Sequence, residues 1–225
     1  MPLLSVIIPL FNEAKTIREI LEKINAVALD KEIIVVDDGS SDGSDKVLRQ
    51  IQRGNLKTVH HTTNRGKGAA FLTGLSLAKG DFIVIQDADL EYEPQEYLNL
   101  LKPLLEDKAD LVLGARFLKG HTGLFMHRAG NRFLTGFLNF LFKSQLNDYL
   151  TCYKMARRET FLSLGLASQK FDIEAEIISK AIRRHLRIAQ VPVSYYPRNY
   201  AQGKKIRWKD GLHAIFSILK HRFSS

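Results

Sequence analysis

Two aspartates separated by one residue follow an apolar segment in the first half of this sequence. They belong to Asp87-Ala88-Asp89, directly after Phe82–Gln86. Carboxylates so close together repel each other, and a divalent cation between them removes that repulsion. Oxygen ligands of this kind suit Mg²⁺ or Mn²⁺. A D-x-D triplet alone is a weak signal, but its position after an apolar strand strengthens it, so the sequence predicts a metal site here.

Acidic residues also follow two other apolar segments. Glu13 comes shortly after Leu4–Ile8, and Asp37 and Asp38 follow Glu32–Val36. Because Asp also suits the corner between a strand and a helix, the alternative is that these acids serve only turns and helix caps. That alternative is weakest for the D-x-D triplet.

A glycine-rich segment, Asn64–Ala70, follows a further apolar segment and opens a predicted helix. Small residues at a helix N-terminus let backbone N–H groups approach an anion. The segment matches neither the P-loop pattern nor the dinucleotide-binding glycine pattern, which disfavours both classes. The alternative is an ordinary helix start with a solvated Lys67.

These acids need a sheet that gathers them at one edge. Val- and Ile-rich segments alternate with helical patterns, which predicts one α/β domain with a central, mostly parallel sheet flanked by helices. In such sheets, ligands bind beyond the carboxyl ends of the strands. The predicted strands are Leu4–Ile8, Glu32–Val36, Lys57–His60, Phe82–Gln86 and Leu111–Leu113, with a strand pair or hairpin at 187–196. The predicted helices are 17–24, Gly66–Ala78, Gln95–Leu105 broken at Pro103, one within 117–142, 172–184 and an amphipathic C-terminal helix at 208–223.

Charge is distributed unevenly along the 225 residues. The formal net charge of +9 suggests an anionic partner. Residues 1–115 hold 13 Lys/Arg against 18 Asp/Glu, a net of −5, and residues 116–225 hold 20 against 6, a net of +14. A lone cysteine, Cys152, excludes an intramolecular disulfide and a four-cysteine zinc site. The acidic half at 1–115 and the basic half at 116–225 therefore need separate explanations.

Five segments in a fixed order carry a family resemblance. SVIIPLFNE, IIVVDDGSSDGS, NRGKGAA, QDADLEYEP and LVLGARF resemble a family 2 glycosyltransferase. DYLTCYK, FDIEAEI and PRNYAQGKKIRWKDG resemble its dolichyl-phosphate mannose synthase-like branch, which comprises polyprenyl-phosphate glycosyltransferases. The resemblance covers nearly the whole chain. It implies a GT-A type, Rossmann-like fold and transfer of a sugar from a nucleotide to a polyprenyl phosphate, with inversion and with Mg²⁺ or Mn²⁺.

The resemblance also implies roles for the acidic half. Asp87 and Asp89 form the pair for metal and diphosphate, and Glu91, where relatives often carry Gln, is a third candidate metal ligand. Asp38 faces the nucleotide base. The implied nucleotide-binding residues are Pro9, Phe11, Glu13, Asp38, Gly66, Asp87, Ala88 and Asp89.

Basic residues are assigned to phosphates by the same resemblance. Arg116 matches a phosphate-contacting Arg of the family, and either Arg128 or Arg132 supplies a second cation. The usual Gly-x-Ser-Lys of a basic loop stands here as Gly203-Lys204-Lys205. The implied acceptor- and phosphate-binding residues are Arg116, Arg128, Arg132, Arg198, Lys204 and Lys205, and the implied catalytic residues are Asp89, Arg116, Arg198, Lys204 and Glu174.

Glu174 bears on the kind of acceptor. It matches a family acid that holds the sugar or the basic loop, and the alternative is a cap for helix 172–184. A hydroxyl acceptor needs a general base, whereas a phosphate is already ionised at neutral pH. The expected reaction is transfer of mannose, glucose or a similar sugar from GDP-mannose or a UDP-sugar to polyprenyl phosphate. The alternatives are a hydroxyl acceptor on a polysaccharide or glycan and, less favoured, a sugar nucleotidyltransferase.

Aromatic and basic residues are interleaved in 117–142 and 208–223. Such a pattern fits either a core-facing helix or a helix at a membrane interface. Because a lipid phosphate lies at a membrane, we expect peripheral attachment to the cytoplasmic face through these segments, which leaves a membrane-protein partner open. No apolar run is long enough to span a bilayer. The sequence lacks zinc spacing and RNA-binding aromatic motifs, so a nucleic-acid partner is not expected.

Overall fold

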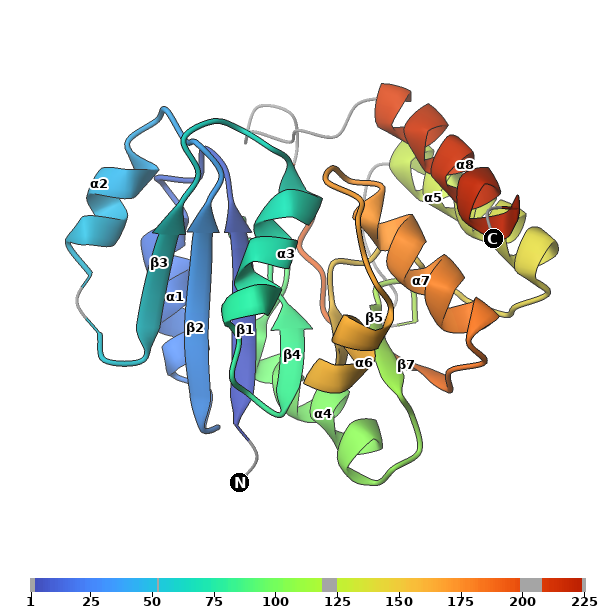
Figure 1. The fold of residues 1–225 in the computed structure, drawn as a ribbon, viewed down its shortest axis with the longest axis horizontal. Coiled ribbons are helices and arrows are strands. Elements are labelled where there is room, and N and C mark those ends of the chain that lie inside the picture. Colours follow the sequence, from blue (N-terminus) through green and yellow to red (C-terminus); the bar gives the residue numbers. More distant parts are fainter. Residues whose placement is uncertain (1–2, 52, 119–124, 199–207, 224–225) are drawn as a thin grey trace.

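The computed structural model describes residues 3–51, 53–118, 125–198 and 208–223 (Figure 1). These residues form a seven-stranded sheet in the order β3-β2-β1-β4-β6-β5-β7. Neighbouring strands are parallel except at β6, which is antiparallel to both β4 and β5. The predicted mostly parallel sheet is confirmed. The strands are β1 (Leu4–Leu10), β2 (Lys31–Asp37), β3 (Leu56–His60), β4 (Phe82–Ile85), β5 (Leu111–Ala115), β6 (Lys154–Arg157) and β7 (Ile188–Pro192).

The continuous apolar runs form the middle of the sheet. β1 lies between β2 and β4, and all four residues of β4 are buried. Strands covered on both faces need this composition, because neither face meets water. In the register of the sheet, Leu10 pairs with Asp37 and Ile7 pairs with Ile85. The segments after β1, β2 and β4 therefore leave the sheet at one edge.

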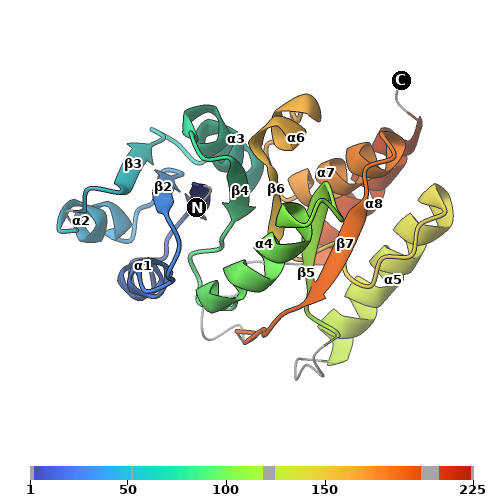
Figure 2. The same cartoon turned by 90° about the horizontal axis from the view of Figure 1, so that it is seen from below.

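Helices cover both faces of the sheet, as Figure 2 shows. α3 and α6 lie on one face, and α1 and α4 lie on the other. α5, α7 and α8 pack against one another near the β7 end of the sheet. The longer helices are α1 (Ile17–Asn25), α3 (Lys67–Leu77), α4 (Tyr97–Leu105), α5 (Phe125–Phe142), α7 (Ile173–Arg183) and α8 (Trp208–Phe223), and the short ones are α2 (Ser44–Arg49), the 3₁₀ turn Pro94–Glu96 and α6 (Arg158–Ser163).

A glycine lets α3 lie close to β1. A Cβ atom on Gly74 would clash with the side chain of Ile7. Any larger residue at 74 would push α3 away from the sheet, and with it the helix start that carries Lys67.

Two strand predictions differ from the structure. Residues 187–196 form no hairpin. β7 pairs in parallel with β5, and a single bridge joins Tyr195 to Tyr92. The sequence analysis also missed β6, because its four residues, Lys154–Arg157, carry two basic side chains and no apolar run.

Two helix predictions also differ. α4 continues through Pro103, because the helix ends only two residues later and loses little backbone hydrogen bonding. On α8, the buried residues include Ala214, Ser217, Ile218 and His221, Ile215 packs partly against the core, and Phe216 is 68% exposed. The buried face of this predicted amphipathic helix is therefore apolar only in part. Among the described residues, no helix is both long enough and apolar enough to cross a bilayer.

Candidate active site

Three distant segments meet around the side chain of Arg198 at the carboxyl edge of the sheet. Nη1 and Nη2 of Arg198 donate to the two carboxylate oxygens of Glu13 at 2.9 and 3.1 Å. Nη2 also donates to Oδ2 of Asp89 at 3.0 Å. The structure thus joins the acid after β1, the second acid of the D-x-D pair and the start of the basic segment, as predicted for a common site.

Glu91 anchors the segment that carries Arg198. Its Oε1 accepts a hydrogen bond from the backbone N–H of Arg198 at 2.7 Å, and its Oε2 accepts one from the hydroxyl of Tyr195 at 2.7 Å. The backbone carbonyl of Glu91 accepts from the N–H of Tyr196 at 2.8 Å. Both carboxylate oxygens of Glu91 therefore hold residues 195–198 against the sheet edge. We call Glu13, Asp89, Glu91 and Arg198 the open cluster.

Asp89 lies among other carboxylates. Burial and the charges of Asp87 and Glu91 raise the pKa of Asp89 to about 7, although Arg198 acts in the opposite direction. Its Oδ1 accepts a hydrogen bond from the N–H of Glu91 at 3.1 Å. An added cation would favour the ionised form of this carboxyl group.

A second ionic cluster joins α3, the end of β4, β6 and α7. Nζ of Lys67 lies 2.8 Å from Oδ1 of Asp87 and 3.0 Å from Oε1 of Glu174. Nζ of Lys154 pairs with the other oxygen of Glu174 and donates to two backbone carbonyl groups. Lys154 is fully buried and Glu174 is 4% exposed. We call Lys67, Asp87, Lys154 and Glu174 the closed cluster.

The closed cluster favours the charged forms of Lys67 and Asp87 despite their burial. Burial alone would lower the pKa of Lys67, but nearby charges, above all that of Asp87, raise it well above its ordinary value. Burial likewise opposes ionisation of Asp87, and Lys67 nevertheless lowers its pKa. Lys67 is therefore not the solvated residue of the alternative interpretation.

Arg116 has a carboxylate partner that the sequence analysis missed. Its Nε and Nη2 donate to the two oxygens of Asp148 at 2.6 and 2.8 Å. Asp148 is fully buried and also accepts from the side-chain amide of Asn131 at 3.1 Å. The guanidinium carbon of Arg116 lies 5.0 Å from the ring centre of Tyr195, which belongs to the segment held by Glu91. The orientation of Arg116 is thus fixed from two sides.

Asp38 holds the turn before α3. Its carboxylate accepts from the backbone N–H groups of Arg65 and Gly66 and lies 2.6 Å from Nδ1 of His61. The residue is only 2% exposed. If Asp38 also contacts the nucleotide base, as predicted, its carboxylate must do so while it holds His61, Arg65 and Gly66.

Gly66 occupies a conformation that favours glycine. Its φ is +101°, and a Cβ atom there would lie 2.5 Å from the carbonyl oxygen of Gln169. The N–H of Ala69 donates to that same oxygen at 2.9 Å. The start of α3 is thus packed on residues 168–170, so one of its first amide groups is already bonded.

The other predicted site residues differ in their surroundings. Pro9 and Phe11 are partly exposed at the end of β1, and Ala88 is buried. Arg128 and Arg132 are exposed on α5, and no contact brings either to the two clusters. Lys204 and Lys205 lie outside the described residues.

Metal ligands do not converge on one point. Among the residues that the structure describes, no three His, Cys, Asp or Glu side chains are grouped to hold a metal ion. Asp87 faces Lys67, Asp89 faces Arg198 and Glu91 faces Tyr195. Asp87, Asp89 and Glu91 therefore lie at one edge of the sheet, but each of these carboxylates pairs with a side chain of the protein.

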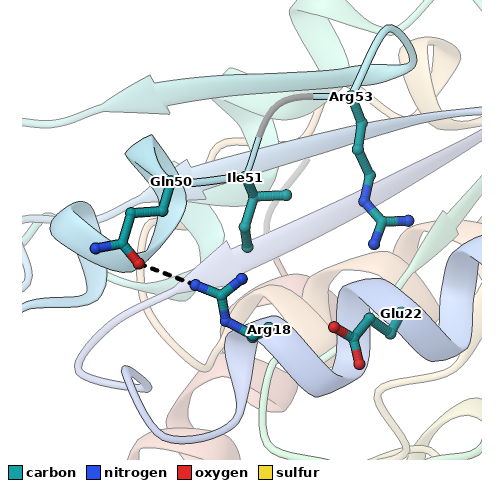
Figure 3. Close-up of a pocket in the computed structure, with 5 residues that line it drawn as sticks. All are labelled: Arg18, Glu22, Gln50, Ile51 and Arg53. Atoms are coloured by element: carbon teal, nitrogen blue, oxygen red, sulfur yellow. Dashed lines mark hydrogen bonds between the residues drawn. The ribbon is translucent and has the colours of Figure 1, made fainter.

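A shallow pocket elsewhere on the surface is lined by Arg18, Glu22, Gln50, Ile51 and Arg53, between α1 and the segment after α2 (Figure 3). Nη2 of Arg18 donates to the side-chain oxygen of Gln50 at 3.0 Å. None of the residues in either ionic cluster lines this pocket.

Residues 5–165 match the family described as "Glycosyl transferase family 2". The chain belongs to glycosyl transferase family 2. This confirms the family that the five ordered segments predicted.

Curated relatives of this family 2 chain include a hexosyltransferase, a glycosyltransferase and a polyprenol monophosphomannose synthase. It is 28% identical over 204 residues to the low-salt glycan biosynthesis hexosyltransferase Agl6 of Haloferax volcanii, covering 88% of this chain and 48% of that protein. It is 29% identical over 196 residues to the glycosyltransferase AglJ of the same organism, covering 86% and 63%. The chain thus spans less than two thirds of either relative. It is 26% identical over 215 residues to the polyprenol monophosphomannose synthase of Mycolicibacterium smegmatis, covering 88% and 79%.

Solved structures confirm the GT-A type fold of this family 2 chain. Glucosyl-3-phosphoglycerate synthase of Mycobacterium tuberculosis, solved with Mn²⁺, uridine diphosphate and phosphoglyceric acid, superimposes with a TM-score of 0.78 at 21% identity, covering 99% of this chain and 79% of that one. At this identity, the likeness concerns the fold.

The donor set of the open cluster fits a divalent cation. Asp89 and Glu91 supply hard oxygen ligands, and burial together with the negative charges of Asp87 and Glu91 raises the pKa of Asp89. Asp87 fits less well, because its Oδ1 is 2.8 Å from the ammonium group of Lys67.

The partners Lys67, Lys154, Asp148 and Tyr195 had no local signal in the sequence. Lys154 and Glu174, for example, are 20 residues apart, and Tyr195 is 104 residues from Glu91. A buried lysine requires a carboxylate nearby, but only the folded chain shows which one.

Proposed function

We propose that this family 2 chain is an inverting, metal-dependent glycosyltransferase that moves mannose, glucose or a similar sugar from GDP-mannose or a UDP-sugar to a polyprenyl phosphate. The observation that carries the proposal is the ionic pairing of Glu174, the acid that bears on the kind of acceptor. Glu174 is buried between the ammonium groups of Lys67 and Lys154. Both carboxylate oxygens of Glu174 are thus occupied by ammonium groups, so an acceptor hydroxyl group would have to compete with Lys67 and Lys154 for them.

A phosphate acceptor does not need that base. A hydroxyl group must lose its proton as it attacks, whereas a phosphate monoester is already ionised at neutral pH. The protein then has to position two anionic groups and to neutralise the charge of the departing nucleoside diphosphate. Arg198, at the sheet edge beside Asp89, supports that task, and we extend it to Arg116, Lys204 and Lys205.

Asp89 and Glu91 would hold a Mg²⁺ or Mn²⁺ ion. Such an ion, when bound, supplies positive charge that stabilises the leaving diphosphate. The chain's own contribution is to hold these carboxylates at the end of β4, where Asp87 is fixed by Lys67. Glu13 and Asp38, after β1 and β2, would complete the nucleotide site together with Pro9, Phe11 and Gly66.

The proposed acceptor places the chain at a membrane surface on the cytoplasmic face. Phe133 and Phe140 are seven residues apart on α5, and Phe216 and Phe223 are seven residues apart on α8, so each pair shares one helix face. All four side chains are at least 66% exposed. The described helices also carry exposed basic residues, and near an anionic membrane each contributes about 1 kcal/mol. They include Arg132, Lys220 and Arg222.

Transfer to lipid tests the activity. The purified chain would be incubated with polyprenyl phosphate in vesicles, Mg²⁺ or Mn²⁺, and a panel of labelled GDP- and UDP-sugars. We expect metal-dependent entry of label from one donor into a lipid that mild acid cleaves, and no entry with an Asp89→Ala variant. Label found only in polysaccharide or protein would contradict the acceptor, and an active Asp89→Ala variant would contradict the metal site.

Vesicle flotation tests the membrane surface separately. The chain should float with vesicles containing anionic phospholipid at low salt, and a Phe140→Ser/Phe216→Ser double variant should float less. A Leu98→Ser/Leu162→Ser variant is the matched control, because these exposed residues lie on α4 and α6. No association of the unchanged protein at low salt would remove the membrane proposal.

A further inference from the structure

Arg198 makes contacts of the kind expected for a bound cation. Its guanidinium group bridges Glu13 and Asp89 through three N–H···O contacts of 2.9 to 3.1 Å. Asp89 is also one of the carboxylates that would hold a divalent metal. We propose that Arg198 is the resident cation of the open cluster and that a divalent metal binds at Asp89 only after displacing its guanidinium group. This inference rests on the metal site proposed above.

The number of charges at this edge supports a replaceable cation. In the described part of the chain, four carboxylates face two cations here. They are Glu13, Asp87, Asp89 and Glu91 against Lys67 and Arg198. Lys67 is committed to the closed cluster through Glu174, so Arg198 is the cation that remains for Asp89. One positive charge shared between two acids leaves the edge with surplus negative charge.

The pairing of Arg198 is also incomplete. Its Nε is buried and makes no hydrogen bond to any described residue. A buried donor without a partner costs free energy, so this arrangement is less favourable than one in which all five N–H groups are bonded. By contrast, Lys154 in the closed cluster donates to a carboxylate and to two carbonyl groups.

The anchor of Arg198 is a second candidate metal ligand. Glu91 holds the backbone N–H of Arg198 and the hydroxyl of Tyr195, each at 2.7 Å. A metal that recruits oxygens of Asp89 and Glu91 would therefore compete with both the side chain and the backbone of Arg198. Metal binding would thereby release the guanidinium group toward an incoming phosphate.

Binding of Mn²⁺ alone, with no nucleotide and no acceptor, tests the competition. Calorimetric titration would compare the unchanged protein with Arg198→Ala and Arg198→Lys. If the guanidinium group occupies the cluster about nine tenths of the time, its removal should tighten Mn²⁺ binding about tenfold, because apparent affinity scales with the competent fraction. Arg198→Lys should fall between the two, since one ammonium group cannot form the same bridge.

Arg187→Ala is the matched control for net charge. Arg187 pairs with Asp107 and Asp110 on the surface and touches neither cluster. Its loss should leave the Mn²⁺ affinity within about twofold of the unchanged protein, because exposed charges are largely screened at this separation. Circular dichroism verifies that each variant is folded. If Arg198→Ala does not fold, the Mn²⁺ affinity of Arg198→Lys still tests the displacement.

Two further results separate this inference from the metal proposal. Equal Mn²⁺ affinity in the unchanged protein and both Arg198 variants would overturn the displacement but leave the metal site standing. Absence of Mn²⁺ binding in every variant, or binding that survives Asp89→Ala, would overturn the metal site and the displacement together. As a direct readout, the Nε–Hε resonance of Arg198 should shift on titration with Mg²⁺, while that of Arg187 should not.

Discussion

The open and closed clusters use the same kinds of side chain at one edge of the sheet, but they differ in how their cations are held. In the closed cluster, Lys154 is on β6, fully buried, and bonded by Glu174 and two carbonyl groups. In the open cluster, Arg198 lies beyond β7, is 16% exposed, and has one buried N–H group that bonds to no residue in the described part of the chain. The closed cluster therefore suits a structural role and the open cluster suits exchange of ligands.

This difference also separates the two acids of the D-x-D pair. Asp87 faces a lysine that Glu174 holds in place, whereas Asp89 faces an arginine whose own anchor is another candidate ligand. The two acids are one residue apart in sequence and yet have different partners. This difference supports the proposal that Asp89 binds a ligand, whereas Asp87 helps to fix the end of β4.

The largest expected effect is on the closed cluster. Lys154→Met should lower the free energy of unfolding by about 3–5 kcal/mol, because it leaves a buried carboxylate with one partner in place of two. Urea denaturation followed by circular dichroism measures this. A loss below about 1 kcal/mol would mean that the closed cluster is not structural.

Arg116→Met should have the next largest effect. Among the described residues, it leaves fully buried Asp148 with the amide of Asn131 as its remaining side-chain partner, at an expected cost of about 3 kcal/mol. The matched variant Asp148→Asn/Arg116→Met removes both charges and should recover part of that loss in the same denaturation experiment. If the double variant were less stable than Arg116→Met, the pair would not be the cause.

Arg198→Met should affect stability less. Its two carboxylate partners are 10% and 16% exposed, so solvent reaches both, and we expect a loss of about 1 kcal/mol. Sugar transfer should nevertheless fall sharply, since the variant lacks the cation for the leaving diphosphate. Thermal melting and initial-rate assays of the same preparation measure the two effects, and a loss of stability as large as that of Lys154→Met would remove the distinction between the clusters.

The smallest expected change in the free energy of unfolding is at a surface ion pair. Lys102 is 74% exposed and lies 4.0 Å from Glu106 on the outside of α4. Lys102→Met should change the free energy of unfolding by less than about 0.5 kcal/mol, because exposed pairs contribute little. A larger change by urea denaturation would show that charge removal itself, rather than burial, sets the order of these effects.

The sequence predicted the parts of the molecule in which local pattern is decisive. β1, β2 and β4 consist of continuous apolar runs, so their existence and parallel arrangement follow from composition and connection. The family resemblance assigned Glu13, Asp89 and Arg198 to nucleotide, metal and phosphate binding, but it predicted no direct contact among these three side chains. β6 could not be predicted in the same way, because its partners lie 71 to 75 residues away in β4 and 41 to 45 residues away in β5, and its own four residues carry no apolar run.

The side chains that pair with the site residues could not be predicted from the sequence, for a related reason. Lys67 was compatible with a solvated helix start, and only packing of Gly66 against Gln169 brings it near Glu174. Asp38 and Glu91 were assigned to ligands, and both also hold the backbone of a neighbouring segment. The same residue types position loops and bind ligands, and only the folded structure distinguishes the two roles.

The central claim is that the acceptor is an ionised lipid phosphate and that no carboxylate of the protein acts as its base. Initial rates of transfer by the unchanged protein to a polyprenyl phosphate and to the same polyprenol without phosphate test this claim directly. We predict transfer to the phosphate and none to the alcohol. Equal or faster transfer to the alcohol, abolished by Glu174→Gln in a variant that remains folded, would contradict it.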